Sequence, residues 1–264
     1  MNSKAIKKQL LAAVAMVLVA AVALGSSTYA WFAASNDVKA EGMMLQAQGE
    51  SGIVIKSDDN PQSKFASIAS AGMTNTEDSK LKPTSTTDLT KWYHATSNEQ
   101  DDAKAKQEAS KYELLDTTTD YVLKRTFTIR SASKDVPVTG VKLAVSNVTV
   151  TKDENNSENL DKALRIGIKV GNAFYIYNPA GDAAETVTMT YGGGSGSVTW
   201  LNAANKTRDL FTLDNNTIPA NDSALKAEIY MWFEGEDANC KSTNVTASLD
   251  KLQVSVTFES VTIA

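Results

Sequence analysis

The sequence has few of the residue types on which catalysis and cross-linking most often depend. One cysteine in 264 residues cannot form a disulfide within the chain, and one histidine excludes zinc sites that need two imidazole ligands. A Ser–His or Cys–His relay has a single candidate base, His94. Glycine and proline number only 14 and 5, which excludes collagen-like and low-complexity fibres. The hydrophobic content of 42% supports a folded core, and no motif predicts a cofactor.

The first thirty residues have the order of an export signal. Three lysines precede an apolar run from Leu10 to Leu24, and small residues follow it as far as Ala30. As a helix this run spans about 22 Å at roughly 1.5 Å per residue, against about 30 Å for the hydrocarbon core of a membrane. We therefore predict a signal helix over residues 1–30, cut by a signal peptidase between Ala30 and Trp31, and a secreted protein that is extracellular or at the cell surface. The alternative is an uncleaved anchor with Trp31 and Phe32 at the membrane interface.

Cleavage there removes three lysines and no acidic residue, so 26 − 3 = 23 basic residues face 31 acidic ones and the net charge becomes −8. The mature chain also has no basic patch and no nucleic-acid-binding motif. Because phosphate backbones are bound by clustered Lys and Arg, we expect no nucleic-acid partner.

From Tyr121 to Phe258 the apolar residues recur at every second position, which is the period of a half-buried strand. The pattern predicts strands within residues 121–130, 136–138, 141–150, 164–170, 174–176, 187–189, 198–200, 225–233 and 252–258. Its phase slips at Ser146–Asn147, which predicts a bulge or bend. Many strands with short connections predict an all-β fold, an antiparallel sandwich of jelly-roll type.

The pattern fails between residues 57 and 120, where Ser, Thr, Asp, Asn and Lys dominate. We expect a sandwich over residues 43–264 with an insertion at about 57–120, which carries a short exposed helix over residues 98–111. Trp92, Tyr93 and His94 form the only aromatic cluster of this insertion. They either pin it to the body, as buried aromatic residues usually do, or form a ligand platform.

Three other local features are candidate sites. Glu234, Glu236 and Asp237 form a weak calcium candidate, but the alternating acids of an EF-hand are absent and a solvated acidic loop is favoured. The glycine-rich stretch 191–197 lacks the Gly-Lys-Ser/Thr ending of a phosphate loop, and we interpret it as a hairpin tip. Cys240 is interpreted as a small buried hydrophobe rather than an exposed thiol.

Two N-terminal stretches carry a family resemblance. Residues 23–32 read ALGSSTYAWF and residues 36–42 read NDVKAEG, and together they resemble the signal and mature start of the TasA/camelysin family of exported fibre proteins. Thr28, Ala30 and Phe32 match the spacing of the family pattern Gly-x-Thr-x-Ala-x-Phe, with Ser26 in place of the glycine. Residues 230–237, YMWFEGED, are similar to the tails of related secreted proteins. The family's signals are cut by a SipW-type signal peptidase.

The resemblance implies a jelly-roll subunit of an extracellular fibre or biofilm matrix, a homopolymer joined by donor-strand exchange. The N-terminal arm, residues 31–42, is compatible with this: Phe32, Ala34, Val38 and Ala40 share one parity, and the apolar phase changes after Gly42. An ordinary first strand with a bulge at Gly42 is an equal alternative. A monomeric surface adhesin and a camelysin-like metallopeptidase are the rival functions. Because the sequence has no His-Glu-x-x-His motif, we predict that the protein is not an enzyme.

Overall fold

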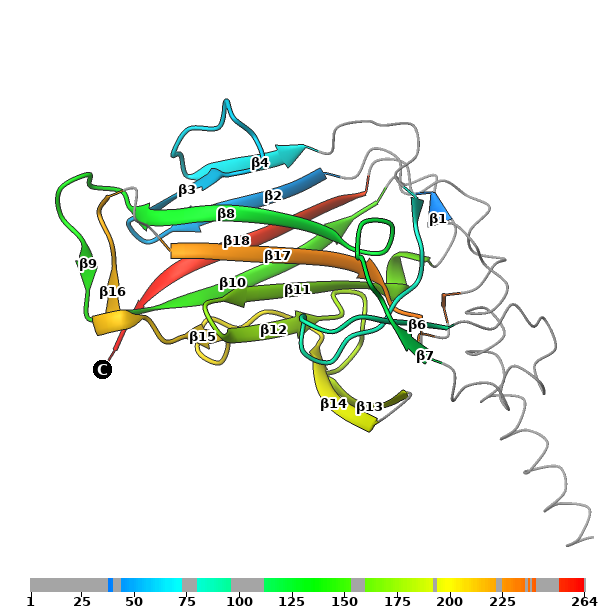
Figure 1. The fold of residues 1–264 in the computed structure, drawn as a ribbon. Coiled ribbons are helices and arrows are strands. Elements are labelled where there is room, and N and C mark those ends of the chain that lie inside the picture. The colour runs from blue at the N-terminus through cyan, green and yellow to red at the C-terminus, as the bar shows by residue number, and fades with distance from the viewer. Residues whose placement is uncertain are drawn as a thin grey trace, which may run out of the picture.

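The computed structural model describes residues 38–39, 44–72, 80–95, 112–152, 160–191, 194–221, 225–235, 237, 239–240 and 252–263. These residues form an all-β structure in which two large sheets pack against each other (Figure 1). The expected signal helix and the expected helix over residues 98–111 lie outside the described residues.

The smaller of the two sheets has five strands in the order β15-β10-β18-β2-β4. Their bounds are Leu210–Phe211 for β15, Val141–Thr151 for β10, Gln253–Thr262 for β18, Met44–Glu50 for β2 and Ile68–Gly72 for β4. The register between β10 and β18 shifts between Val145 and Asn147, which confirms the predicted bulge. Strand β4 lies within the segment expected as an insertion, so that segment supplies an edge of the main sheet.

The larger sheet has seven strands in the order β13-β14-β12-β11-β17-β8-β3. Their bounds are Glu185–Tyr191 for β13, Gly194–Leu201 for β14, Ala173–Tyr177 for β12, Leu164–Val170 for β11, Leu225–Phe233 for β17, Leu123–Ser131 for β8 and Ile53–Ser57 for β3. Tyr191 pairs with Gly194, so the glycine-rich stretch is a hairpin tip as predicted.

Six further short elements lie outside these sheets. They are β1 (Val38–Lys39), β5 (Lys80–Leu81), β6 (Tyr93–Ala95), β7 (Tyr112–Leu114), β9 (Val138–Thr139) and β16 (Thr217–Ile218), which pair as β1 with β5, β6 with β7 and β9 with β16. Two single turns of 3-10 helix, Leu160–Ala163 and Asp214–Asn216, complete the described elements.

The expectation of a purely antiparallel sandwich is wrong at two pairs. Strand β2 runs parallel to β18 along seven residues, and β12 runs parallel to β14 at Ile176 and Tyr177. The two-residue period reports which side of a strand is buried and carries no information about the direction of its neighbour. A parallel pair also needs a long connection, and here most of the chain separates β2 from β18.

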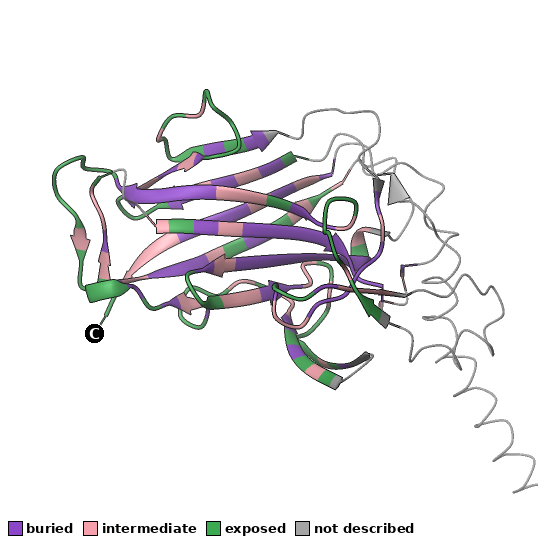
Figure 2. Ribbon diagram, viewed as in Figure 1, coloured by how far each residue is buried: buried purple, intermediate pink, exposed green. Residues whose placement is uncertain are grey.

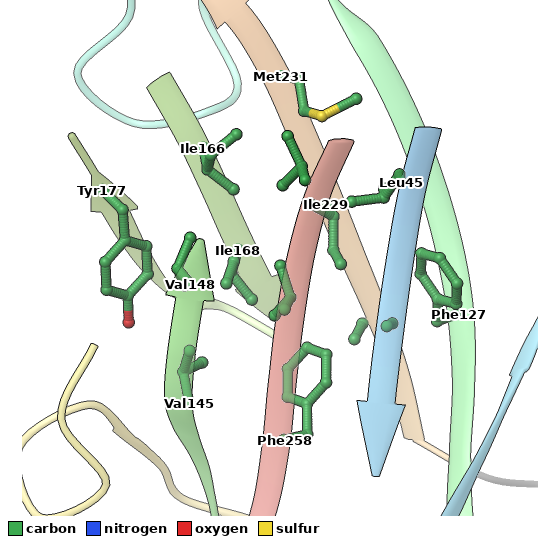
Figure 3. Close-up of a cluster of buried hydrophobic side chains, with 14 of the residues drawn as sticks. Leu45, Phe127, Val145, Val148, Ile166, Ile168, Tyr177, Ile229, Met231 and Phe258 are labelled. Atoms are coloured by element: carbon green, nitrogen blue, oxygen red, sulfur yellow. The ribbon is translucent and has the colours of Figure 1, made fainter. Parts of the chain in front are cut away.

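The main core lies between the two sheets (Figure 2). Successive strands of the two sheets often change sheet, as from β2 to β3, β3 to β4, β10 to β11 and β17 to β18. Each strand presents alternate residues inward, and Figure 3 shows Phe127, Ile166 and Ile229 of one sheet facing Leu45 and Phe258 of the other. All five of these side chains have an exposed fraction of 0%.

A second cluster covers the outer side of the seven-stranded sheet. Residues 81–95 and 112–122, here called the outer segment, place Leu89, Trp92 and Val122 against the sheet. The remaining buried members of this outer cluster are Ile176, Met189, Val198, Trp200, Tyr230 and Trp232. Because Trp92 is only 4% exposed, the prediction that it pins the insertion to the body is confirmed.

Gly167 of β11 makes room for this docking. A Cβ atom at Gly167 would lie 2.6 Å from Leu89 Cδ2 and 3.2 Å from Trp232 Cζ3, closer than side chains normally pack. Leu89 itself has a φ of 57°, a left-handed conformation that costs a branched residue free energy. Hydrogen bonds from the Leu89 and Asp88 amides to Thr86 Oγ1 hold this turn.

Candidate functional site

Two acidic residues after β17, Glu234 and Asp237, are largely buried, contrary to the favoured interpretation of a solvated loop. Glu234 has an exposed fraction of 0% and accepts a hydrogen bond from Trp232 Nε1 at 3.1 Å and another from Ser85 Oγ. Its amide donates to the Ala163 carbonyl at 2.8 Å. The sequence pattern missed this because the outer segment, which supplies Ser85, lies 149 residues away along the chain.

Asp237 pairs with an arginine. Arg165 Nη2 lies 2.5 Å from Asp237 Oδ2, and the guanidinium stacks on the Trp200 ring with its carbon 4.1 Å from the ring centroid. Arg165 is fully buried, and the ion pair offsets part of the cost of removing its charge from water. Glu236 lies outside the described residues, and within them no group of three His, Cys, Asp or Glu side chains could hold a metal ion.

Cys240 lies beside this cluster and is fully buried, which confirms the interpretation of a small buried hydrophobe. Burial raises the pKa of the thiol well above its usual value, and the nearby carboxylates of Glu234 and Asp237 raise it further. Because the thiolate is the reactive form, this cysteine is protonated and unreactive at neutral pH. The cluster ties the outer segment, β11 and the 234–240 loop together.

The aromatic residues of the insertion have different surroundings. Trp92 contacts Trp232 edge-on at 5.1 Å between ring centroids and Tyr230 at 6.0 Å, so its faces are occupied by protein. The ligand-platform interpretation is therefore wrong for Trp92. His94 is half-buried, with its ring 5.5 Å from that of Tyr121.

The N-terminal arm is described at two positions. Val38 pairs with Leu81 and Lys39 with Lys80, in an antiparallel ladder between β1 and β5 of the same chain. The other predicted assembly residues, Phe32, Ala34, Ala40 and Gly42, lie outside the described residues, as do the predicted cleavage residues Ala30 and Trp31. In the part of the chain that is described, no helix is both long and apolar enough to span a membrane.

The arm leads into a strand that is paired along both sides. Strand β2 pairs with β18 from Met44 to Glu50 and with β4 from Met44 to Gln48. Leu45 and Ala47 of β2 have an exposed fraction of 0%. A tension applied through the arm would therefore load two hydrogen-bonded ladders in shear together with buried side chains.

A groove that the sequence did not indicate lies where β12 and β14 diverge. Its volume is about 340 Å³, and Phe174, Tyr175, Val198, Leu201 and Arg208 contribute to its lining. Because β12 and β14 pair only at the ends of the two strands, the wedge between them stays open. Its walls come from strands that are not consecutive in the chain, so no local pattern could have found it.

A buried carboxylate braces one side of this groove. Asp209 has an exposed fraction of 0%, accepts a hydrogen bond from Tyr177 Oη at 2.9 Å and pairs with Arg208 Nε at 2.7 Å. Burial and the Asp209 charge raise the pKa of Tyr177 far above its usual value, so the phenol stays protonated and continues to donate. The arrangement fixes the 205–211 loop against the sandwich.

The described residues therefore form an all-β structure with two large packed sheets, a docked outer segment and a groove between strand edges. No protein-family model, curated protein or solved structure matches the chain.

Proposed function

We propose that this protein is a secreted structural subunit of an extracellular fibre or biofilm matrix. In this proposal the sandwich is of jelly-roll type, and residues 31–42 of one copy pair with a sheet edge of the next. The export-type N-terminus and the resemblance to the TasA/camelysin family support the proposal. The frequent passage of the chain from one sheet to the other supports the jelly-roll assignment.

The observation that carries the proposal is the pairing of β2, the strand that follows the arm in the sequence. A fibre subunit must transmit tension from its joining strand into its own fold, and β2 is paired with β18 on one side and with β4 on the other. By contrast, the pairing of the arm with β5 covers two residues, Val38 and Lys39, among those that the structure describes. Such a ladder contributes few hydrogen bonds, each of about 0.5–1.5 kcal/mol, and can be exchanged for a longer one.

Ordering of the arm is favourable only if a neighbouring subunit supplies a sheet edge with which the arm can form hydrogen bonds. Burial of Phe32, Ala34, Val38 and Ala40 contributes about 4–8 kcal/mol, taking roughly 1.5–3 for each larger side chain and less for alanine. Ordering about ten residues costs roughly 10–20 kcal/mol. Side-chain burial alone is therefore too small, and the arm orders along its length only where a neighbour adds ladder hydrogen bonds.

Truncation and charge substitution test the proposal. A variant that begins at Gly42 is expected to stay folded and to form no fibres, and Phe32→Asp or Val38→Asp in the mature chain is expected to slow or stop polymerisation. Val136→Asp is the matched control, because Val136 is 63% exposed in the loop before β9. Negative-stain microscopy and size-exclusion chromatography of the secreted protein provide the readout. Unchanged fibres from the truncated protein would refute the arm as the joining strand.

The groove between β12 and β14 favours a second candidate function, a monomeric adhesin. Its volume of about 340 Å³ lies in the range of small-ligand sites, and aromatic side chains beside a charged one suit a polar polymer such as a glycan. A glycan array with the monomeric protein tests this function. Binding that is lost in Phe174→Ala, without fibres from the parent chain, would favour the adhesin over the fibre.

A further inference from the structure

The outer edge of β13 has the geometry of an interface between two copies of this chain. In the antiparallel pair of β13 with β14, Tyr191 and Gly194 flank a two-residue turn and therefore exchange hydrogen bonds. Bonded positions alternate in such a ladder, so the backbone groups of Met189 and Val187 also point to β14. The N–H and C=O groups of Thr186, Thr188 and Thr190 consequently point away from the sheet, toward the open edge.

A hydrogen bond on β14, the other strand of the hairpin, agrees with this orientation of the backbone groups. The same alternation directs the Leu201 carbonyl away from β13, and this carbonyl accepts a hydrogen bond from the Asn178 amide at 2.7 Å on that side. Among the described residues, β13 has β14 as its only ladder partner. Figure 1 shows that the β13–β14 hairpin curves away from the other strands of the seven-stranded sheet, of which β13 is an edge strand.

The other three edge strands of the two large sheets are less suited to pairing than β13, because one is shorter, one is covered by other residues and one has a lower strand propensity. Strand β15 has two residues. Strand β3 is covered, because Ile55 exchanges hydrogen bonds of 2.8 and 3.0 Å with Ala66 and the Ser57 amide donates to Ser63 Oγ. Strand β4 reads IASAG, and alanine, serine and glycine are weak strand formers. Strand β13 reads ETVTMTY, with strong strand formers and no lysine or proline to block pairing.

The sequence of β13 is complementary to itself. An antiparallel pair of two copies centred on Thr188 places Thr186 opposite Thr190 and Val187 opposite Met189 of the second copy. Glu185 then lies opposite Tyr191, so no two carboxylates face each other across the pair. The register also brings together the outward-directed backbone groups, because positions 186, 188 and 190 are the ones that bond in it. A twofold contact of this kind is closed and self-complementary.

We propose that two copies of this chain pair through β13, antiparallel and centred on Thr188, to make one continuous sheet. The contact goes beyond the proposed fibre function, because it does not use the arm and joins subunits laterally. It requires only the folded sandwich with its hairpin.

Cysteine cross-linking of the secreted protein tests both the contact and its register. In Thr188→Cys the two new thiols face each other, with the Cα separation of about 5.5 Å that a bonded antiparallel pair and a disulfide share. In the matched control Thr186→Cys, on the same edge, the two thiols are four positions apart along the paired strands. At about 3.3 Å per residue that is roughly 13 Å, too far for a disulfide. The parent chain has only the buried Cys240 and is expected not to cross-link.

After mild oxidation, non-reducing electrophoresis is expected to show a covalent dimer for Thr188→Cys, at least tenfold more abundant than for Thr186→Cys. The same dimer is expected in Thr188→Cys combined with Phe32→Asp, so failure of the arm proposal leaves this result unchanged. Equal cross-linking at both positions would overturn the register, and no cross-link at either position would overturn the contact. Sedimentation of Thr188→Lys, expected to lower the dimer fraction at least tenfold, provides a measurement that needs no new cysteine.

Discussion

Replacement of Trp92 by alanine tests whether the outer segment is a docked layer or part of the main fold. Trp92 is 4% exposed and belongs to the outer cluster, where it packs on Trp232 and Tyr230. The main core between the two sheets contains none of these three side chains. The substitution therefore removes contacts between the outer segment and the sheet and leaves the contacts between the two sheets intact.

The size of the effect follows from these contacts. Truncation of a buried aromatic side chain costs about 3–5 kcal/mol, which includes about 0.5–1.5 kcal/mol for each well-placed aromatic pair. The polar contacts of the outer segment remain, among them the 3.1 Å hydrogen bond from the Thr84 amide to the Phe233 carbonyl. If docking contributes less free energy than the substitution removes, the segment opens locally while the sandwich stays folded.

Hydrogen exchange and urea unfolding, measured together, distinguish the local from the global effect. In Trp92→Ala, amide protection in residues 81–95 and 112–122 is expected to fall by more than about 100-fold, since 1.4 kcal/mol corresponds to a factor of ten. The urea midpoint is expected to fall less than in Phe127→Ala, which removes a fully buried side chain of the main core. Val136→Ala, at a 63% exposed position, is the neutral control.

Two results would refute this reasoning. If Trp92→Ala lowers the urea midpoint as much as Phe127→Ala and deprotects both sheets, the outer segment and the sandwich are one cooperative unit. If it changes neither the midpoint nor the protection of the outer segment, Trp92 does not hold the segment in solution.

Three further outcomes are expected. Gly167→Ala should deprotect the outer segment without a comparable loss in the sandwich, because its Cβ would lie 2.6 Å from Leu89 Cδ2. Hydrogen-exchange mass spectrometry of Gly167→Ala, with the exposed-site variant Val136→Ala as the control, measures this. Cys240 should resist alkylation at pH 8 in the native protein and react after unfolding, and rapid native labelling would contradict its burial. Against the effect of burial, hydrogen bonds from Lys124 and Tyr230 lower the pKa of Glu228, so its contribution is present above the unfolded pKa of about 4.3 and is lost as the pH falls through the folded pKa. At pH 7 the free energy of unfolding of Glu228→Gln should be about 0.2–1 kcal/mol lower than that of the parent chain. At pH 3 the two proteins should be equally stable, and urea titrations from pH 3 to 7 measure the difference.

Many of the strands could be predicted because a strand that is buried on one side has apolar residues at every second position of its sequence. The alternation of Leu164, Ile166, Ile168 and Val170 predicts β11, and all four side chains lie in the main core. The phase slip at Ser146 predicts the bulge in β10 for the same reason. The glycine-rich stretch predicts the hairpin of β13 and β14, since turn residues act through local backbone conformation.

The candidate site was less predictable because it depends on residues distant in the chain. Glu234, Glu236 and Asp237 read as a hydrated loop, since carboxylates in a run are usually solvated. Burial of Glu234 requires Ser85 from the outer segment, and Asp237 requires Arg165 from β11. The groove between β12 and β14 has no local signature at all, because it forms where two parallel strand ends separate.

The sequence alone determined the fold class, the bulge and the hairpin, since each depends on the period of apolar residues or on local turn chemistry. Only the tertiary structure decided the docking of Trp92, the parallel pairing of β2 with β18, the buried ion pair of Arg165 with Asp237 and the place of β13 at the edge of its described sheet. The physical reason is that a side chain's neighbours along the chain fix which side of a strand is buried. The direction and identity of the strand beside it are fixed by contacts between different segments of the chain, which can lie far apart in sequence, as β2 and β18 do.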